Sequence, residues 1–437
     1  MDAPGRLSRS REDGCSGRTH GRIVMEPLLL WGSICGEVFW HASPGPLPAG
    51  RPPPQAQLVP SPQPWREAGG CRCSAMVTKR LGPVPESASR AGAGSASRAR
   101  TVTWSPSVTL VPTRSCFNAC SYCSFRRPPD PGDPLADALG DREAVQVLTQ
   151  RPQASEVLLL SGEVAPGSPH RRAWFARLSA LSRLALAQGR LPHTNAGPLS
   201  RREMAALGRL NPSMGLMLEG LGPAYDALHR RAPSKRLEMR LGQLEQAGRL
   251  GIPFTTGLLL GVGESRADRL KALELLAELQ RRWGHLQEVI LQPWRPDGAE
   301  GLPLADAPCS ELLETIVAAR AILPPEVHLQ LPPNLWPLAR LLEALEAGID
   351  DLGGIDVHDV INAAYPQPAI APLRQVLEPS GWQLRPRLCV HRRWLAWLPE
   401  GLRRQCQAVG HRLRHLHGPL AHDLAHDLAH APIWPAC

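Results

Sequence analysis

Three cysteines of the 437-residue chain stand close together, as Cys116, Cys120 and Cys123. A Cys-x3-Cys-x2-Cys spacing on a loop lets three thiolates converge on one iron–sulfur cluster, and a four-iron cluster held by three cysteines keeps one iron open to another ligand. Structural zinc is the alternative, but it takes four protein ligands, usually with paired Cys-x2-Cys spacing. No second pair and no adjacent histidine follow this loop. The spacing therefore favours a [4Fe-4S] cluster.

The cysteine loop follows the first of eight short apolar runs, which alternate with amphipathic stretches such as 171–188 and 265–282. Runs of that length are typical of buried strands, and the longer stretches have the period of helices. Strand and helix alternating up to eight times over about 250 residues predict an α/β fold, a parallel (β/α) barrel of the TIM type, with its chemistry at the strand ends. The eight runs are 107–112, 156–160, 191–194, 214–218, 254–260, 288–292, 328–331 and 348–352.

The segments on either side of the barrel differ from it in composition. Residues 1–100 are rich in proline, glycine, serine and arginine and have no sustained period, which predicts a disordered arm. Its apolar patch at 27–40 is shorter than a membrane span requires. We expect the barrel over 101–360, followed by a small helical cap and a low-complexity tail over 361–437. In that tail, His422, His426 and His430 have helical spacing that could hold a metal, although a low-complexity end explains them more simply.

The net charge of +9 raises nucleic acid or a membrane surface as partners. Only Lys79, Lys235 and Lys271 are lysines among the 49 basic residues, and the arginines are scattered along the chain. Scattered arginines do not make the basic stripe that binds phosphate backbones. We therefore expect no nucleic-acid partner, no membrane segment and a cytoplasmic protein.

The cysteine loop, placed at the end of the first predicted strand with the aromatic Tyr122 before its last cysteine, resembles the radical S-adenosylmethionine (SAM) superfamily. The resemblance implies that Cys116, Cys120 and Cys123 hold a [4Fe-4S] cluster whose open iron binds the methionine end of SAM, and that Tyr122 lies near the adenine. It therefore implies two cofactors, the cluster and SAM.

Further cofactor contacts are implied at other strand ends. Residues 160–163, Leu-Ser-Gly-Glu, stand where the superfamily has a Gly-Gly-Glu-like segment that contacts the methionine amine, with a serine in place of the first glycine. Glu219 could hold the SAM ribose or amine, or be a structural buried carboxylate. Arg240 could pair with the SAM carboxylate, or lie on the surface. The implied SAM contacts are Ser161, Gly162, Glu163, Glu219, Arg240, Gly261 and Gly263.

Longer motifs extend the resemblance to the deazaflavin-forming synthases of the CofG type, over about 105–370. These motifs are His-Thr-Asn-Ala-Gly at 193–197 and the segments 213–219, 253–264, 285–292 and 332–335. The resemblance implies substrate contacts at Asn195, Gln292, Arg295 and Asn334. His193 is the first choice for a proton-transfer residue, because an unperturbed imidazole titrates near neutral pH.

This family forms 7,8-didemethyl-8-hydroxy-5-deazariboflavin, the deazaflavin precursor coenzyme F0. The resemblance implies the substrate 5-amino-5-(4-hydroxybenzyl)-6-(D-ribitylimino)-5,6-dihydrouracil, supplied by a CofH-type radical SAM subunit. An electron from a donor such as ferredoxin or flavodoxin would cleave SAM to a 5′-deoxyadenosyl radical. Benzylic hydrogen abstraction, ring closure, loss of ammonia and one further oxidation would follow. The alternatives are another biotin-synthase-like radical SAM enzyme, or a non-catalytic metal protein that binds nucleic acid.

Overall fold

The computed structural model describes residues 100–417, except 131, 134, 297 and 300–303. The arm predicted over 1–100 lies outside the described residues, apart from its last residue. The low-complexity end with His422, His426 and His430 also lies outside them.

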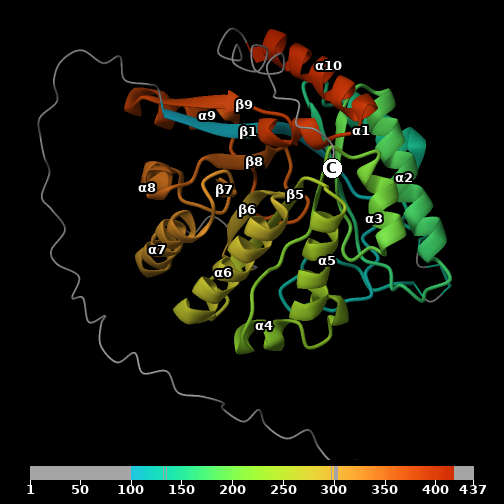
Figure 1. Cartoon of the computed structure of the whole chain (residues 1–437), viewed down its shortest axis with the longest axis horizontal. Helices are drawn as coiled ribbons and strands as arrows, with labels where there is room; N and C mark the ends of the chain where they lie inside the picture. Colours follow the sequence, from blue (N-terminus) through green and yellow to red (C-terminus); the bar gives the residue numbers. More distant parts are fainter. Residues whose placement is uncertain (1–99, 131, 134, 297, 300–303, 418–437) are drawn as a thin grey trace, which may run out of the picture. The chain divides into compact units, whose positions relative to one another are not determined.

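Eight parallel strands close into a barrel, as the sequence predicted (Figure 1). Each strand pairs with the next along the chain, and β1 pairs with both β2 and β8, which closes the sheet on itself. The strands are β1 (Arg100–Leu110), β2 (Glu156–Leu160), β3 (Leu191–Asn195), β4 (Ser213–Gly215), β5 (Phe254–Leu260), β6 (Leu286–Pro293), β7 (His328–Gln330) and β8 (Asp351–Ile355). The predicted and observed bounds are identical for β2 and β5.

Helices surround the strands and bury their apolar faces against them (Figure 1). In α6, for example, Ser265 caps the first turn by accepting from the backbone N–H of Asp268 at 3.1 Å, and Leu273 and Leu276 face the core. The helices are α1 (Asp141–Thr149), α2 (Arg171–Ala187), α3 (Arg201–Gly208), α4 (Pro223–Leu228), α5 (Leu237–Arg249), α6 (Arg266–Trp283), α7 (Asp306–Ile322), α8 (Leu341–Ala347), α9 (Ile370–Leu377) and α10 (Glu400–His417). No helix in residues 100–417, as described, is long and apolar enough to cross a membrane.

The other six strands differ from their predicted bounds, and the turns beside β4 and β8 explain two of these differences. Strand β4 stops at Gly215, and four residues further on Glu219 has a positive φ of 73°, which a regular strand does not allow. Strand β8 begins at Asp351 rather than at 348, because Gly348 ends α8 with a φ of 130°. The run at 214–218 therefore continues past β4 into a turn, and the run at 348–352 begins in the turn before β8.

The C-terminal cap contains a strand as well as the expected helices. Strand β9 (Trp382–Pro386) pairs in parallel with the first residues of β1, so that it extends the sheet beyond the barrel. Residues 387–391 follow β9, and α10 packs against α2 and β3 through Leu186 and Leu191. The cap is therefore attached to the N-terminal ends of the barrel strands, opposite the ends that carry the cysteine loop.

Candidate active site

The cysteine loop leaves β1 and lines a cavity with all three of its thiols, which are free. Backbone hydrogen bonds hold the loop. The amide of Cys116 donates to the carbonyl of Arg127 at 3.0 Å, and the amide of Ala119 donates to the carbonyl of Arg231 at 2.7 Å. Burial raises the pKa of Cys116, and it raises that of Cys120 to about 11. Without a cluster, Cys116 and Cys120 therefore keep their protons near neutral pH, and a metal must displace these protons.

The donor set suits a cluster better than a single zinc ion. Two thiolates on one zinc lie about 3.8 Å apart, given Zn–S bonds of about 2.3 Å. Among the described residues, the metal-ligating side chains whose donor atoms all lie within 4.8 Å of one another are Glu288, Asp351 and His391, and the three cysteines are not such a group. Three thiols around a wider space fit a four-iron cluster with one open position.

The cysteine loop and the end of β2 are in backbone contact at Gly162. The amide of Gly162 donates to the carbonyl of Thr113 at 2.7 Å, and a Cβ added at Gly162 would lie 2.1 Å from the carbonyl oxygen of Ser115. Only glycine allows this approach. Ser161, the residue that departs from the superfamily pattern, accepts from the indole N–H of Trp174 at 3.0 Å, so its hydroxyl also fixes α2 to the strand end.

Glu163 lies beside the cysteines in a buried polar group. Its carboxylate accepts from Asn118 Nδ2 at 2.9 Å, from Arg240 Nη2 at 3.0 Å and from the hydroxyl of Ser234. Arg240 is 1% exposed, which excludes the surface alternative for this residue. Glu163 and Arg240 both line the cysteine cavity.

Glu219 lies in the same cavity and accepts from Lys235, His229 and Tyr122, with 2.9 Å to His229 Nε2. Burial alone would raise the pKa of Glu219, but Lys235, His229 and Arg240 more than offset it and hold this pKa well below the usual range. Glu219 is therefore a carboxylate near neutral pH. Its positive φ places the side chain among these donors, a strained backbone of the kind found at functional sites.

The sequence motifs did not single out four polar residues around these carboxylates. Lys235 had a detectable signal, since it is one of three lysines in an arginine-rich chain. The other three have no comparable signal, because their role depends on contacts across the barrel mouth. These three are Asn118, His229 and Ser234.

A second cavity fills the interior of the barrel, with an empty volume of about 1100 Å³ that includes open solvent at its mouth. It runs from the first residues of β2 and β6 to the residues after β8. Asn195 and Gln292 line both cavities, and so do three apolar residues, Leu160, Met217 and Ile361. The two cavities therefore meet at a shared wall formed by these five residues.

His193 lies deeper in the barrel cavity, on β3. Burial lowers its pKa to about 4, so the titration range that singled it out does not hold in the folded protein. Its Nδ1 is 2.7 Å from Ser213 Oγ, and that hydroxyl donates to the carbonyl of Cys389 at 2.6 Å. Since Ser213 has one proton to give, Nδ1 must donate to it, which leaves Nε2 as an unprotonated acceptor.

Four other predicted site residues line neither cavity. Gly261 and Gly263 have positive φ angles of 89° and 96° in the turn after β5. Arg295 lies over the ring of Tyr365, 5.1 Å from its centroid. Asn334 donates to Asp359 Oδ2 at 2.8 Å and to the carbonyl of Tyr365 at 2.9 Å. The structure does not bring these four together with the other site residues.

The chain matches the family model described as the radical SAM superfamily over residues 110–276. It is 49% identical to the 7,8-didemethyl-8-hydroxy-5-deazariboflavin synthase of Thermosynechococcus vestitus over 71% of this chain and 98% of that protein. It is 49% identical to the synthase of Synechococcus elongatus, over 69% of this chain and 90% of that protein.

A solved structure with a similar fold is the FeFe-hydrogenase maturase HydG from Carboxydothermus hydrogenoformans. Its TM-score is 0.53 at 18% identity, covering 76% of this chain and 81% of that chain. Three observations indicate the same family. They are the barrel, the three cysteines around one cavity, and the similarity along nearly the whole length of the curated relatives. The chain belongs to the 7,8-didemethyl-8-hydroxy-5-deazariboflavin synthase family of radical SAM enzymes.

Proposed function

We propose that this protein forms 7,8-didemethyl-8-hydroxy-5-deazariboflavin from 5-amino-5-(4-hydroxybenzyl)-6-(D-ribitylimino)-5,6-dihydrouracil. The main support is the 49% identity over 98% of a synthase named for that product. A cysteine cavity that shares a wall with a polar cavity inside the barrel fits such a reaction. The bound cluster and SAM would supply a radical able to take a hydrogen atom from the substrate.

In this proposal Cys116, Cys120 and Cys123 hold the cluster, and the charged groups around them hold SAM. The methionine end of SAM carries an ammonium and a carboxylate, so its site needs acceptors and donors. Glu163 and Glu219 are the acceptors, while Arg240 and Lys235 are the cations. The pairing of these side chains with one another keeps the site neutral when SAM is absent.

The shared wall is the proposed place where the substrate meets the SAM side. Asn195 and Gln292 offer amide groups that can orient a heterocycle by hydrogen bonds. Leu160, Met217 and Ile361 are apolar, and a bound substrate packed against them would displace water from the position between the two cavities. Exclusion of water protects a reactive species from side reactions.

We further propose that the electron donor is a small acidic protein such as ferredoxin or flavodoxin. Arginines surround the cysteine loop: Arg126 lines its cavity, and Arg127, Arg230 and Arg231 are exposed beside it. Opposite charge on the donor would speed encounter and make the rate of reduction fall with salt. Charge reversal at Arg230 and Arg231 should slow reduction by flavodoxin and leave reduction by dithionite unchanged.

The test supplies the anaerobically reconstituted protein with SAM, a reductant and the adduct made by a CofH-type subunit. We expect a blue-fluorescent deazaflavin, 5′-deoxyadenosine and about four irons per chain. Cys120→Ser should abolish all three, whereas Cys309→Ser, which changes a buried thiol on α7, should keep them. Deoxyadenosine without deazaflavin would indicate another biotin-synthase-like enzyme. Zinc without iron would indicate the non-catalytic alternative.

A further inference from the structure

The barrel cavity is closed at its N-terminal end by residues 387–391 of the cap, which we call the floor segment. The carbonyl of Cys389 accepts from Ser213 Oγ at 2.6 Å and from Gln287 Nε2 at 3.0 Å. The amide of His391 donates to Gln287 Oε1 at 3.1 Å. Arg387 and Cys389 line the cavity. The cap therefore forms part of the reaction chamber as well as covering the barrel.

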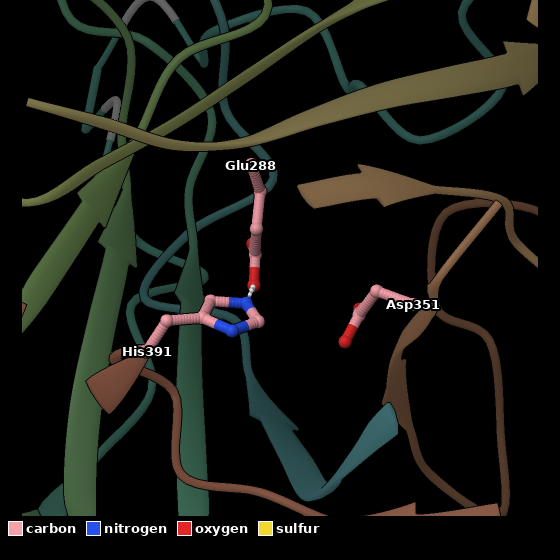
Figure 2. A group of neighbouring side chains, drawn as sticks. All are labelled: Glu288, Asp351 and His391. Carbon is pink, nitrogen blue, oxygen red and sulfur yellow. Dashed lines mark hydrogen bonds and ion pairs between the residues drawn. The ribbon is translucent and has the colours of Figure 1, made fainter. Parts of the chain in front are cut away.

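Arg387 is fully engaged in a buried ion-pair network. Its Nε and Nη2 donate to Asp351 at 2.5 and 2.7 Å, Nη2 lies 2.5 Å from Glu288 Oε1, and Nη1 donates to the carbonyl of Leu388 at 2.9 Å. Figure 2 shows Glu288 hydrogen-bonded to His391, and the carboxylate of Asp351 lies across the space from the imidazole ring. These three side chains could otherwise suggest a metal site. Because the guanidinium already occupies oxygens of both carboxylates, a divalent cation would have to displace it in order to bind there.

Glu156, the first residue of β2, faces the same network beside the hydroxyl of Ser105 and without an ion-pair partner. It is 7% exposed and lines the cavity, and it makes no ion pair within the described part of the chain. Four neighbouring groups influence the pKa of Glu156: Arg387 from the floor segment, Glu288 from β6, Asp351 from β8 and the hydroxyl of Ser105 on β1. Burial is the largest influence, and it raises the pKa of Glu156 to about 7.

The imidazole of His193 adds a second uncommitted acceptor at this depth. Its Nδ1 proton is given to Ser213, so Nε2 carries a lone pair, and no described side chain is bonded to it. His193 and Glu156 line one cavity together with the hydroxyls of Ser107 and Thr109. Both groups face the cavity, where water solvates them when no ligand is bound, and the hydroxyl groups of a ligand can take the place of that water.

We propose that Glu156 and His193 form a subsite at the cavity floor that binds an uncharged, hydroxyl-rich arm of the substrate. This inference rests on the proposed function, because the proposed substrate carries a ribityl chain. Strand β2 spans about 13 Å from Glu156 to Leu160 at roughly 3.3 Å per residue. A substrate with its reacting carbon at the shared wall can therefore extend its polyol arm down to the floor.

The charges of the floor favour a neutral arm over an ionic one. Of the five N–H groups of Arg387, its bonds to Asp351, Glu288 and Leu388 engage four, which leaves little for a phosphate or carboxylate. A cationic arm would meet carboxylates already paired with that arginine. Hydroxyl groups donate and accept at the same atom, so they can satisfy His193 Nε2 and either protonation state of Glu156.

The test measures equilibrium binding of the deazaflavin product by its own fluorescence, with an analogue that carries methyl in place of the ribityl chain. We expect the wild-type protein to bind the ribityl form about tenfold to a hundredfold more tightly. Glu156→Ala should bring this ratio close to one, and Glu156→Gln, which keeps the hydrogen-bonding shape, should stay within a few-fold of wild type. His358→Ala, at the exposed mouth of the same cavity, should leave the ratio unchanged.

These outcomes separate the subsite from the proposed function. Equal binding of the two ligands by wild type, or an unchanged ratio in Glu156→Ala, would overturn the subsite even if the protein forms deazaflavin. Failure to form deazaflavin from the adduct, with the binding ratio as expected, would overturn the proposed function and leave the polyol subsite supported.

Discussion

Replacing Arg387 by methionine removes the cation that bonds Asp351 and Glu288 beneath the barrel cavity. These carboxylates are 0% and 3% exposed, so few water molecules can solvate them in place of the guanidinium. Loss of one partner from a buried ion pair costs about 3–5 kcal/mol, because the other partner keeps its charge without compensation. We expect Arg387→Met to lower the free energy of unfolding by that amount at pH 8.

Urea unfolding measures this cost. With a slope of about 3 kcal/mol per molar urea, the midpoint should fall by roughly 1–1.7 M. The loss should also depend on pH. Arg387 offsets the effect of burial on Glu288, so without the arginine burial raises the folded-state pKa of Glu288 above its unfolded value. The stability that this group contributes is then present at low pH and lost as pH rises through the folded pKa. The difference from wild type should therefore shrink between pH 8 and pH 5.

A matched variant shows whether the unpaired charge is the cause. The triple variant Arg387→Met, Asp351→Asn, Glu288→Gln removes the arginine and both carboxylates. It should recover at least half of the stability lost in Arg387→Met, because neutral groups of the same shape cost less to bury than charged ones. The reasoning would be refuted if Arg387→Met stayed within about 1 kcal/mol of wild type. It would also be refuted if the triple variant were no more stable than the single one.

Two further predictions follow from single residues. Burial raises the pKa of Glu156 from 4.5 to about 7. Wild type should therefore lose about 3 kcal/mol of stability relative to Glu156→Gln as pH rises from 4.5 to 7. Chemical denaturation measures both proteins across this range, and parallel pH profiles would contradict the prediction. Gly162→Ala should displace the cysteine loop and lower the iron content of reconstituted protein, because its Cβ meets the carbonyl of Ser115 at 2.1 Å. The control Gly242→Ala, on the exposed face of α5 with nothing within 4 Å, should keep full iron content and add about 0.5–1 kcal/mol of stability.

Local patterns predicted the barrel and the cysteine loop well. The apolar runs that became β2 and β5 end where the strands end, because polar or glycine-rich turns bound them directly. The spacing of Cys116, Cys120 and Cys123 is itself local, and it correctly indicated three thiols around one cavity. Such features need no knowledge of distant residues.

The floor of the barrel could not be predicted in this way. Glu156 was predicted as the first residue of a strand and Asp351 as an interior residue of the run 348–352, while Arg387 is one arginine among many. They meet because β9 pairs with β1 and carries the chain beneath the barrel, which is a long-range contact without a local signal. For the same reason, no local pattern indicated that Cys389 lines the barrel cavity.

Transfer of a labelled hydrogen is the most direct measurement of the proposed chemistry. The reconstituted protein would be given SAM, a reductant and the adduct carrying deuterium at its benzylic carbon, and 5′-deoxyadenosine would be analysed by mass spectrometry. We expect deoxyadenosine with one deuterium, formed together with the deazaflavin and absent in Cys120→Ser. Unlabelled deoxyadenosine, with both deuterium atoms kept in the recovered adduct, would contradict the account.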